Sequence, residues 1–388
     1  MDFRLGGNTA ELRAEVRAFL DEHITDALKE RVYRTGVSHD DDFTKALVER
    51  GWYAPGWPVE LGGQGRDPIE MLVIYEELRY ADAPTYSIGT TTMVAGVIRE
   101  VGTPEQKAAI IPPALRGELV IVLGFSEPDA GSDVAAAVTR AVRDGDEWVI
   151  NGQKMFTTNA QIGDYVFLLT RTNTEVAKHQ GLTMFLVPMD QPGIEIQAVH
   201  TMSGERTNIT FYNDVRVSDE WRIGEVDGGW ATMMVSLKLE HGNGFAHALL
   251  RLLRGAERWA RDAVDDDGIP RLDDPDVRER LGRTATDAEV SRLLLRRSAW
   301  MAEEGIPTKA EGPMTKLFSS EALERRAQDL TEVMGPDALR SYFEPTAPSN
   351  GSIEHMLRHA LGTTIYAGTS EVHRNTIAQR GLGLPRSG

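Results

Sequence analysis

The sequence predicts a mostly α-helical protein with a central β domain, and two changes in the spacing of apolar residues support this. Apolar residues recur at helical spacing at the start of the chain, alternate with polar residues from about Val120, and return to helical spacing after Gly229. These changes divide the 388 residues into an N-terminal helical domain at 1–119, a middle β domain at 120–226 and a C-terminal helical bundle at 227–388.

The N-terminal domain is expected to consist of amphipathic helices. Its first helix is indicated by an apolar face that comprises Leu12, Val16, Phe19, Leu20 and Ile24. A stretch rich in proline and glycine at 55–65 separates this region from later helices, because these residues do not fit inside a regular element.

The middle domain is expected to be a barrel or a sandwich of β-strands. Strands are predicted at 165–170, 182–187 and 209–217. Another strand, at 148–150, lies between Asp144-Gly145 and Asn151-Gly152, which are dipeptides that supply the positive φ of tight hairpin turns.

The C-terminal domain returns to the helical period. Trp230, Met233 and Leu237 share one helix face, and Leu249, Leu252 and Leu253 begin the next helix. An acidic loop at 265–276 and a proline-rich loop at 343–351 interrupt the helices, so this third is expected to be a helical bundle.

Composition excludes several classes of function. The formal net charge is -17, and lysine and arginine are dispersed, so no nucleic-acid partner is expected. The absence of cysteine excludes disulfides, thiolate nucleophiles and cysteine-ligated metals, and no metal site is predicted. The N-terminus has no apolar run that suits a signal peptide or a membrane span, so we expect a soluble cytoplasmic protein.

Two segments carry hydroxyl groups where a cofactor could bind. Residues 124–133 read GFSEPDAGSD, a turn that can present backbone N–H groups to a phosphate or to a ring edge. Residues 151–159 read NGQKMFTTN and place threonines beside an aromatic residue at a strand end. An ordinary Pro-Asp turn and edge-strand threonines are the alternative interpretations.

A third segment, IYAGTSEVHR at 365–374, completes a set that resembles the signatures of the acyl-CoA dehydrogenase family. The runs GWP at 56–58 and GTPEQK at 102–107 extend the resemblance to nearly the whole chain. It implies a helical domain, a β-barrel and a four-helix bundle, assembled as a tetramer. It also implies FAD as cofactor, acyl-CoA as substrate and an electron-transfer flavoprotein as electron acceptor.

The resemblance also implies which residues bind the cofactor. Contacts to the flavin and its diphosphate are expected from Phe125, Ser126, Ser132, Phe156 and Thr158, and contacts to the nucleotide half from Thr369 and Glu371. Leu123, Gly131 and Thr157 are expected to bind the cofactor as well, and Gly335 lies where the family approaches the adenine. Serine and threonine hydroxyls supply hydrogen bonds to a flavin without adding charge.

Glu240 is the candidate base. Many family members carry a glutamate where this chain has Ala367, whereas a minority carry it on the first helix after the β domain, where this chain has Glu240. Glu240 follows Met233 by seven residues and therefore shares its apolar helix face, where desolvation would raise the pKa of the carboxyl. A charge at the edge of that face, paired with an arginine of a neighbouring helix, is the alternative.

Ala367, Gly368 and His241 are the predicted substrate-binding residues. In related enzymes the amide at the position of Ala367 binds the thioester oxygen, which stabilises the enolate-like charge. His241 replaces the arginine that usually follows the glutamate, and the bundle segment that usually reaches a neighbouring flavin is replaced by residues 268–274, which include Arg271. These departures resemble actinobacterial dehydrogenases of steroid side-chain CoA thioesters, in which two different subunits sometimes share the flavin sites.

The sequence thus predicts FAD-dependent oxidation of an acyl-CoA to its 2,3-enoyl thioester, in a homotetramer or a heterotetramer. Two alternatives remain. The chain could be an acyl-CoA oxidase or a flavin monooxygenase on the same fold, or a non-catalytic partner subunit that completes the site of another chain.

Overall fold

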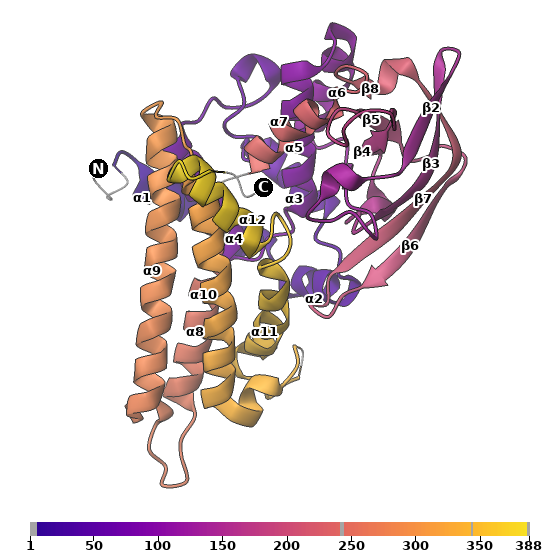
Figure 1. Cartoon of the computed structure of the whole chain (residues 1–388). Helices are drawn as coiled ribbons and strands as arrows, with labels where there is room; N and C mark the ends of the chain where they lie inside the picture. Colours follow the sequence, from indigo (N-terminus) through magenta and orange to yellow (C-terminus); the bar gives the residue numbers. More distant parts are fainter. Residues whose placement is uncertain (1–5, 241–243, 343, 386–388) are drawn as a thin grey trace.

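The computed structural model describes residues 6–240, 244–342 and 344–385, apart from the side chains of 237–240. Figure 1 shows a long helical bundle on one side, a β-sheet domain on the other, and the N-terminal helices lying against both. Helix α5 contacts both strand β1 and helix α7, and α4 contacts the bundle helices α8 and α9. The three parts therefore meet around the N-terminal helices.

The N-terminal part is helical, as the apolar pattern predicts. Its helices are α1 (Thr9–His23), α2 (Asp26–Thr35), α3 (Asp41–Arg50), α4 (Pro68–Tyr80), α5 (Tyr86–Val101) and α6 (Pro104–Leu115). The predicted apolar face of α1 is buried in a core that it shares with α3, α4 and α5. Thr103 and Gln106 form a reciprocal capping box that begins α6.

The middle part is a single sheet. Its strands are β1 (Ile121–Gly124), β2 (Arg140–Asp144), β3 (Glu147–Met155), β4 (Tyr165–Arg171), β5 (Leu182–Pro188), β6 (Ile194–His200), β7 (Arg206–Ser218) and β8 (Arg222–Ile223). The strand order is β6-β7-β3-β2-β4-β5-β8, and β1 pairs with β4 in parallel.

This sheet curls around its own core. Trp148 on β3 and Phe185 on β5 are separated by two intervening strands, yet their ring centroids lie 5.4 Å apart. Strands three positions apart in a flat sheet would be about 14 Å apart, at about 4.8 Å per strand. The curl therefore encloses the buried side chains of β2, β3, β4, β5 and β7.

Two details of the sheet differ from the sequence-based expectation. Strand β6 is not predicted, because its residues are largely exposed at the sheet edge and carry a weak apolar pattern. Asn151-Gly152 does not form a hairpin turn but lies inside β3, where the register shifts between Ile150 and Gly152. A Cβ at Gly152 would stand 2.7 Å from the Thr139 Cα, so the glycine permits a close approach of backbones in this bulge.

The C-terminal part begins with α7 (Gly229–Glu240), which packs against α5. The bundle that follows comprises α8 (Ala246–Asp262), α9 (Pro275–Glu303), α10 (Glu311–Met334) and α11 (Ser352–Thr363), and the short helix α12 (Ser370–Thr376) packs on α10. Its core is mostly leucine and alanine from α8, α10 and α11.

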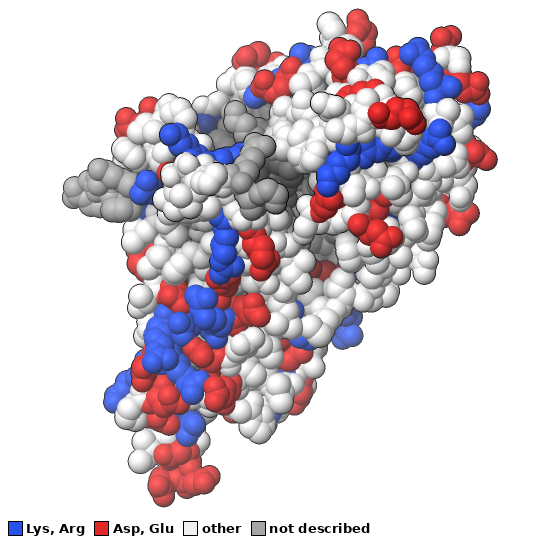
Figure 2. All heavy atoms as spheres, in the orientation of Figure 1, with Lys and Arg blue, Asp and Glu red and all other residues white. Residues whose placement is uncertain are grey.

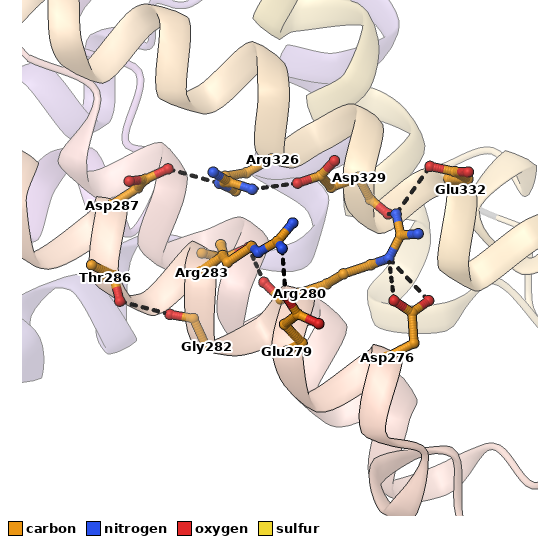
Figure 3. Close-up of polar contacts among 11 residues, drawn as sticks. Asp276, Glu279, Arg280, Gly282, Arg283, Thr286, Asp287, Arg326, Asp329 and Glu332 are labelled. Carbon is orange, nitrogen blue, oxygen red and sulfur yellow. Dashed lines mark hydrogen bonds and ion pairs between the residues drawn. The ribbon is translucent and has the colours of Figure 1, made fainter.

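Ion pairs join α9 to α10 along the bundle (Figure 3). Arg326 on α10 lies 2.7 Å from Asp287 on α9 and also contacts Asp329. Arg280 on α9 lies 3.0 Å from Glu332 on α10. Charge-assisted hydrogen bonds of this kind fix how the two long helices are aligned. Among the described helices, none combines the length and apolar character needed to cross a membrane.

Candidate active site

The segment 124–133 is a tight turn that leaves β1. Glu127 and Ala130 exchange two backbone hydrogen bonds, of 3.0 and 3.1 Å, and the turn is tied to β3 by the Met155 N–H, which donates to the Ser126 carbonyl at 2.9 Å. Leu123, Phe125 and Ser126 are half-buried, whereas Gly131 and Ser132 are exposed. A Cβ at Gly131 would meet no atom within 4 Å, so the outer part of the turn is open to a ligand.

A buried ion pair holds this turn. Lys154 Nζ lies 2.8 Å from Glu127 Oε1 and donates to the Phe125 carbonyl at 3.1 Å. The Glu127 carboxylate also accepts from the backbone N–H groups of Val138 and Thr139, at 2.7 and 2.9 Å. Burial lowers the pKa of Lys154 to about 8 despite the nearby carboxylate. Burial acts to raise the pKa of Glu127, but Lys154 and the hydrogen bonds outweigh it, so that pKa is below its usual range.

The strand end at 156–159 has an unusual backbone and exposes an aromatic ring. Phe156 and Asn159 both have φ of 64°, and Phe156 is 58% exposed. Thr157 and Thr158 contact Thr210 and Thr207 through their hydroxyls, at 3.3 and 3.0 Å. Asn159 is buried, and within the described residues its side-chain amide atoms, Nδ2 and Oδ1, have no hydrogen-bond partner.

These features suit a flavin. An exposed ring offers an apolar surface, and the hydroxyls and unpaired amide offer neutral hydrogen-bonding capacity beside it. Positive φ at non-glycine residues is strained, and such strain is found preferentially at ligand sites. The residue set at this strand end therefore fits the group that the sequence predicts there.

The segment after α11 presents free amide groups. Ala367 has φ of 53° and Gly368 of 88°. The Ala367 carbonyl accepts from His373 Nε2 at 3.0 Å, and the Gly368 carbonyl accepts from the buried Lys316 Nζ at 2.5 Å. Within 6–240, 244–342 and 344–385, neither the Ala367 nor the Gly368 N–H has a hydrogen-bond partner. Because a trans peptide is planar, fixing the Ala367 carbonyl also fixes the Gly368 N–H on the opposite side.

Thr369 and Glu371 lie at the start of α12. The Thr369 hydroxyl accepts from the Val372 N–H at 3.3 Å, and the pKa of the exposed Glu371 is lowered, first by a hydrogen bond from its own backbone N–H. Both residues line a surface hollow of about 470 Å³, together with Ile365 and charged side chains of α10. The neighbouring Ser370 hydroxyl is buried and has no partner among the described residues.

Gly335 lies apart from the other predicted cofactor residues. It ends α10 with φ of 58°, in the turn that follows at the far end of the bundle from α12 (Figure 1). Trp259 and Asp337 form a 2.9 Å hydrogen bond beside this turn. Within one subunit the structure therefore does not bring Gly335 to the other cofactor residues.

A contact links the start of the chain described after α7 to the residue before Ala367. Helix α7 ends at Glu240, whose side chain lies outside the described residues, as does the whole of His241. Phe245, five residues after Glu240, packs edge-on against Tyr366 with ring centroids 6.1 Å apart. Tyr366 directly precedes Ala367, and Met233 on α7 is fully buried. Phe245 thus joins the chain that follows α7 to the residue before Ala367.

Figure 2 shows the surface hollowed between the bundle and the sheet domain. Side-chain contacts connect the bundle to the sheet domain at this junction. His359 on α11 contacts Glu205 of the β6–β7 loop at 3.2 Å and the Tyr366 hydroxyl at 3.5 Å. Thr207, at the start of β7, contacts Thr158. These contacts link Tyr366 to Glu205, and the strand end at 156–159 contacts β7 two residues beyond Glu205.

Sequence reasoning did not assign roles to several of these residues. Glu127, Lys154 and Asn159 stand inside the recognised segments, so their position was a signal that could have been used. Lys316 and His359 lie in helices without a recognised motif, and only the fold shows which carbonyl or carboxylate each contacts.

Comparison with known proteins shows the family of the chain. Three family models match the chain: "Acyl-CoA dehydrogenase, N-terminal domain" at residues 8–118, "Acyl-CoA dehydrogenase, middle domain" at 122–215 and "Acyl-CoA dehydrogenase, C-terminal domain" at 227–382.

Similar sequences and structures cover 97% or more of the chain. "Acyl-CoA dehydrogenase FadE26" of Mycobacterium tuberculosis is 37% identical and covers 97% of this chain and 97% of its own. The ChsE4-ChsE5 complex of Mycobacterium tuberculosis contains a chain that superimposes with a TM-score of 0.92 at 36% identity, covering 100% of both chains. The "Tcur3481-Tcur3483 steroid ACAD" gives a TM-score of 0.89 at 34% identity, again over 100% of both chains.

Proposed function

This chain belongs to the acyl-CoA dehydrogenase family of FAD-dependent oxidoreductases, and we propose that Glu240 is the base that removes the α-proton of its substrate. The observation that carries the proposal is the return of the chain after α7, which packs Phe245 against Tyr366, the neighbour of Ala367. Alanine has no group that can accept a proton, so the base must come from another element, and α7 ends at Glu240.

The chain has two tasks when the Cα–H bond breaks. The Glu240 carboxylate takes the proton, and a base in such a position works best when desolvation brings its pKa nearer to the working pH. The negative charge that develops at the thioester oxygen needs hydrogen-bond donors held in place beforehand. The unpartnered N–H groups of Ala367 and Gly368 are suitable donors, and the Gly368 N–H is held in place because His373 fixes the Ala367 carbonyl of the same peptide group.

The residues that would hold FAD are those of the turn 124–133, the strand end 156–159 and the start of α12. When bound, FAD accepts the hydride from the substrate Cβ. We propose that an electron-transfer flavoprotein then takes the electrons, as the family resemblance implies. The isolated position of Gly335 suits a contact with the cofactor of a neighbouring subunit, and we propose a tetramer with two kinds of chain, as the ChsE4-ChsE5 complex has two.

We propose a bulky acyl group, of the steroid side-chain type, as the substrate class. The steroid ACAD named above is a similar protein. Ala367 leaves more space beside the thioester than a glutamate would. A Cβ at Gly89 on α5 would meet no atom within 4 Å, and Tyr86, one turn earlier, is 46% exposed. Helix α5 therefore leaves space for a large group.

The test is anaerobic bleaching of the bound flavin by CoA thioesters of short, branched, long and steroidal acids. Glu240→Gln is expected to keep its flavin and to lose bleaching by about 10²- to 10⁴-fold, the usual effect of losing one general base. Glu225→Gln, at an exposed glutamate just before α7, is the matched control and should bleach normally. Adding Ala367→Glu to Glu240→Gln should restore part of the rate.

Undiminished bleaching of Glu240→Gln would remove Glu240 from this role. Rapid formation of peroxide in air would favour an oxidase instead. A purified chain that is colourless, and turns yellow only with a second related subunit, would favour the partner role.

A further inference from the structure

Helix α10 carries a buried lysine to which the proposed proton transfer gives no role. Lys316 is 5% exposed, and its Nζ donates to the Gly368 carbonyl at 2.5 Å. Lysine is among the residues that are rarely buried, because taking an ammonium group out of water has a large free-energy penalty. A lysine is therefore an unfavourable choice at a position that serves packing alone.

One turn of α10 contacts both chain segments of the proposed reaction site. The Ser319 hydroxyl accepts from the Phe245 N–H at 2.9 Å, in the chain that follows α7. A Cβ at Gly244 would lie 2.7 Å from a methyl group of the same turn, so this chain passes close to α10. Lys316 lies in that turn and binds Gly368, in the segment before α12, which packs on α10 (Figure 1). The ammonium group is thus placed beside the thioester segment by the helix that also holds the chain after the proposed base.

The hydrogen bond from Lys316 fixes one peptide group of the thioester segment. In a planar trans peptide, the Gly368 carbonyl and the Thr369 N–H point in opposite directions. His373 holds the preceding peptide in the same way, through the Ala367 carbonyl. Within the described part of the chain, the Thr369 N–H has no hydrogen-bond partner. The ammonium group therefore holds this peptide from the side of its oxygen and leaves its N–H available to a ligand.

The positive charge lies within electrostatic reach of the proposed thioester site. An oxygen bound at the Gly368 N–H would lie at most about 9 Å from the ammonium nitrogen, since one residue and two hydrogen bonds separate them. The other charges near this segment are less effective. Glu371 and Arg374 on α12 are exposed, and Arg374 pairs with Glu321 at 2.7 Å. Water and salt screen exposed charges far more than a buried one.

We propose that Lys316 positions the Gly368–Thr369 peptide and that its positive charge stabilises the negative charge that develops on the thioester oxygen as the α-proton leaves. A fixed charge in the interior suits this task, because water screens it little and it does not reorient during the reaction. This inference rests on the proposed function, since it concerns the same thioester. The alternative is a structural role, in which Lys316 only holds the segment before α12 against α10.

The experiment uses CoA thioesters in which sulfur replaces Cβ, made from the thioesters that bleach the flavin. They can lose the α-proton but have no Cβ–H bond, so the enolate accumulates in the wild-type holoenzyme. An enolate beside an oxidised flavin is an electron donor beside an acceptor and absorbs at long wavelength. The pH at which this band is half-formed measures how readily the bound thioester ionises. Because Glu240 can hold the same proton, this midpoint belongs to the pair.

Variants separate charge from shape. Lys316→Gln keeps N–H donors for the Gly368 carbonyl but removes the charge. It should raise the midpoint by about one pH unit, the effect of a unit charge about 9 Å away at an effective dielectric constant of about 20. Lys316→Arg keeps the charge and should stay near the wild-type midpoint. If Lys316→Gln does not fold, Lys316→Met is the second neutral variant, because a flexible apolar side chain suits a buried site.

Arg326→Met is the matched control. It removes another cation of α10, about 15 Å further along the helix, where Arg326 pairs with Asp287 at 2.7 Å. This change should lower the stability of the bundle and leave the midpoint where it is in the wild type. A loss of stability alone therefore does not imitate the expected effect of the Lys316 variants.

The two proposals fail in different ways. If neither the thioesters nor their sulfur analogues change the flavin spectrum, the proposed function fails. If the wild type forms the band and the neutral variant has the same midpoint, the inference about Lys316 is overturned while the function stands. An equal rise in Lys316→Gln and Lys316→Arg would assign the effect to shape and would overturn the inference as well.

Discussion

Replacing Lys154 by methionine tests whether the buried ion pair of Lys154 and Glu127 holds the turn at 124–133 in place. The lysine side chain is 0% exposed and its partner Glu127 is 5% exposed. Lys154→Met leaves a carboxylate buried without its cation, a change that typically costs about 3–5 kcal/mol. Because the backbone N–H groups of Val138 and Thr139 still donate to that carboxylate, we expect the lower end, about 3 kcal/mol.

The second variant, Glu127→Gln, keeps an acceptor for those N–H groups but leaves the lysine buried. Its expected loss of folding free energy is limited, because the buried lysine can release its proton and become neutral. Neutralising a lysine of ordinary pKa near 10.4 at pH 7 costs about 4–5 kcal/mol at most, at about 1.4 kcal/mol per pKa unit. The pKa of Lys154 is already about 8 in the folded chain, so part of this cost is present in the wild type.

The double variant Lys154→Met/Glu127→Gln should be destabilised by less than the sum of the single changes, with a coupling energy of about 1–3 kcal/mol. Urea denaturation at one fixed FAD concentration measures all four proteins. The exposed pair of Lys178 and Asp133, 2.6 Å apart with both side chains about half exposed, lies beside the same turn. Lys178→Met is therefore the matched control, with an expected cost of about 0–1 kcal/mol.

A functional measurement completes this test. Lys154 Nζ also donates to the Phe125 carbonyl, so its loss should weaken FAD binding more than the Lys178 change does. Flavin fluorescence during titration of the FAD-depleted proteins measures this. Two results would refute the reasoning. One is that the stability losses of the two single variants add up to that of the double variant within about 0.5 kcal/mol. The other is that Lys154→Met and Lys178→Met bind FAD equally well.

Two further predictions concern the Ala367 segment and pH. Gly368→Ala should lower the free energy of unfolding by about 1–2 kcal/mol and slow flavin bleaching, because φ is 88° and the new Cβ would lie 2.9 Å from His373 Nε2. Gly282→Ala, in open space on α9, should be neutral or stabilising, and equal effects of the two in thermal unfolding would contradict this account. His247 is neutral in the folded chain because its pKa is lowered, first by burial, whereas the unfolded chain takes up a proton below about pH 6.5. Stability from this group is therefore complete above about pH 6.5 and lost as pH falls below it, by up to about 1.4 kcal/mol per pH unit. His247→Asn should flatten the pH dependence of the urea midpoint in that range, whereas a control at the exposed His200 should not.

The helices and most strands follow from spacing that the sequence shows directly. The apolar face of α1 is buried as predicted, and the predicted strands at 165–170 and 182–187 correspond to β4 and β5. The spacing does not predict strand β6, because an exposed edge strand has little apolar alternation. Asn151-Gly152 was placed in a turn because the dipeptide permits positive φ, and sequence alone does not separate a turn from a bulge.

The sequence predicts the parts of the candidate site that lie in local motifs. It does not predict contacts between residues that are far apart in the chain. The turn at 124–133 and the segment at 365–374 were identified from local sequence. The contact of Glu205 with His359 was not, because the two residues come from the β6–β7 loop and from α11, in different domains. Such a group has no spacing rule, and each member alone resembles an ordinary surface charge.

Two buried lysines act in the same way on the two ligand-facing segments. Lys154 donates to the Phe125 carbonyl, and Lys316 donates to the Gly368 carbonyl. In each case an ammonium group in the interior holds a backbone carbonyl, so that the geometry of the ligand-facing peptides does not depend on the exposed side chains. Under the proposed function, this separation allows alanine at 367, where the sequence resemblance places a glutamate in many family members. The proposed base can then lie on another helix, while His373 and Lys316 hold the two successive peptide groups that begin at the Ala367 and Gly368 carbonyls.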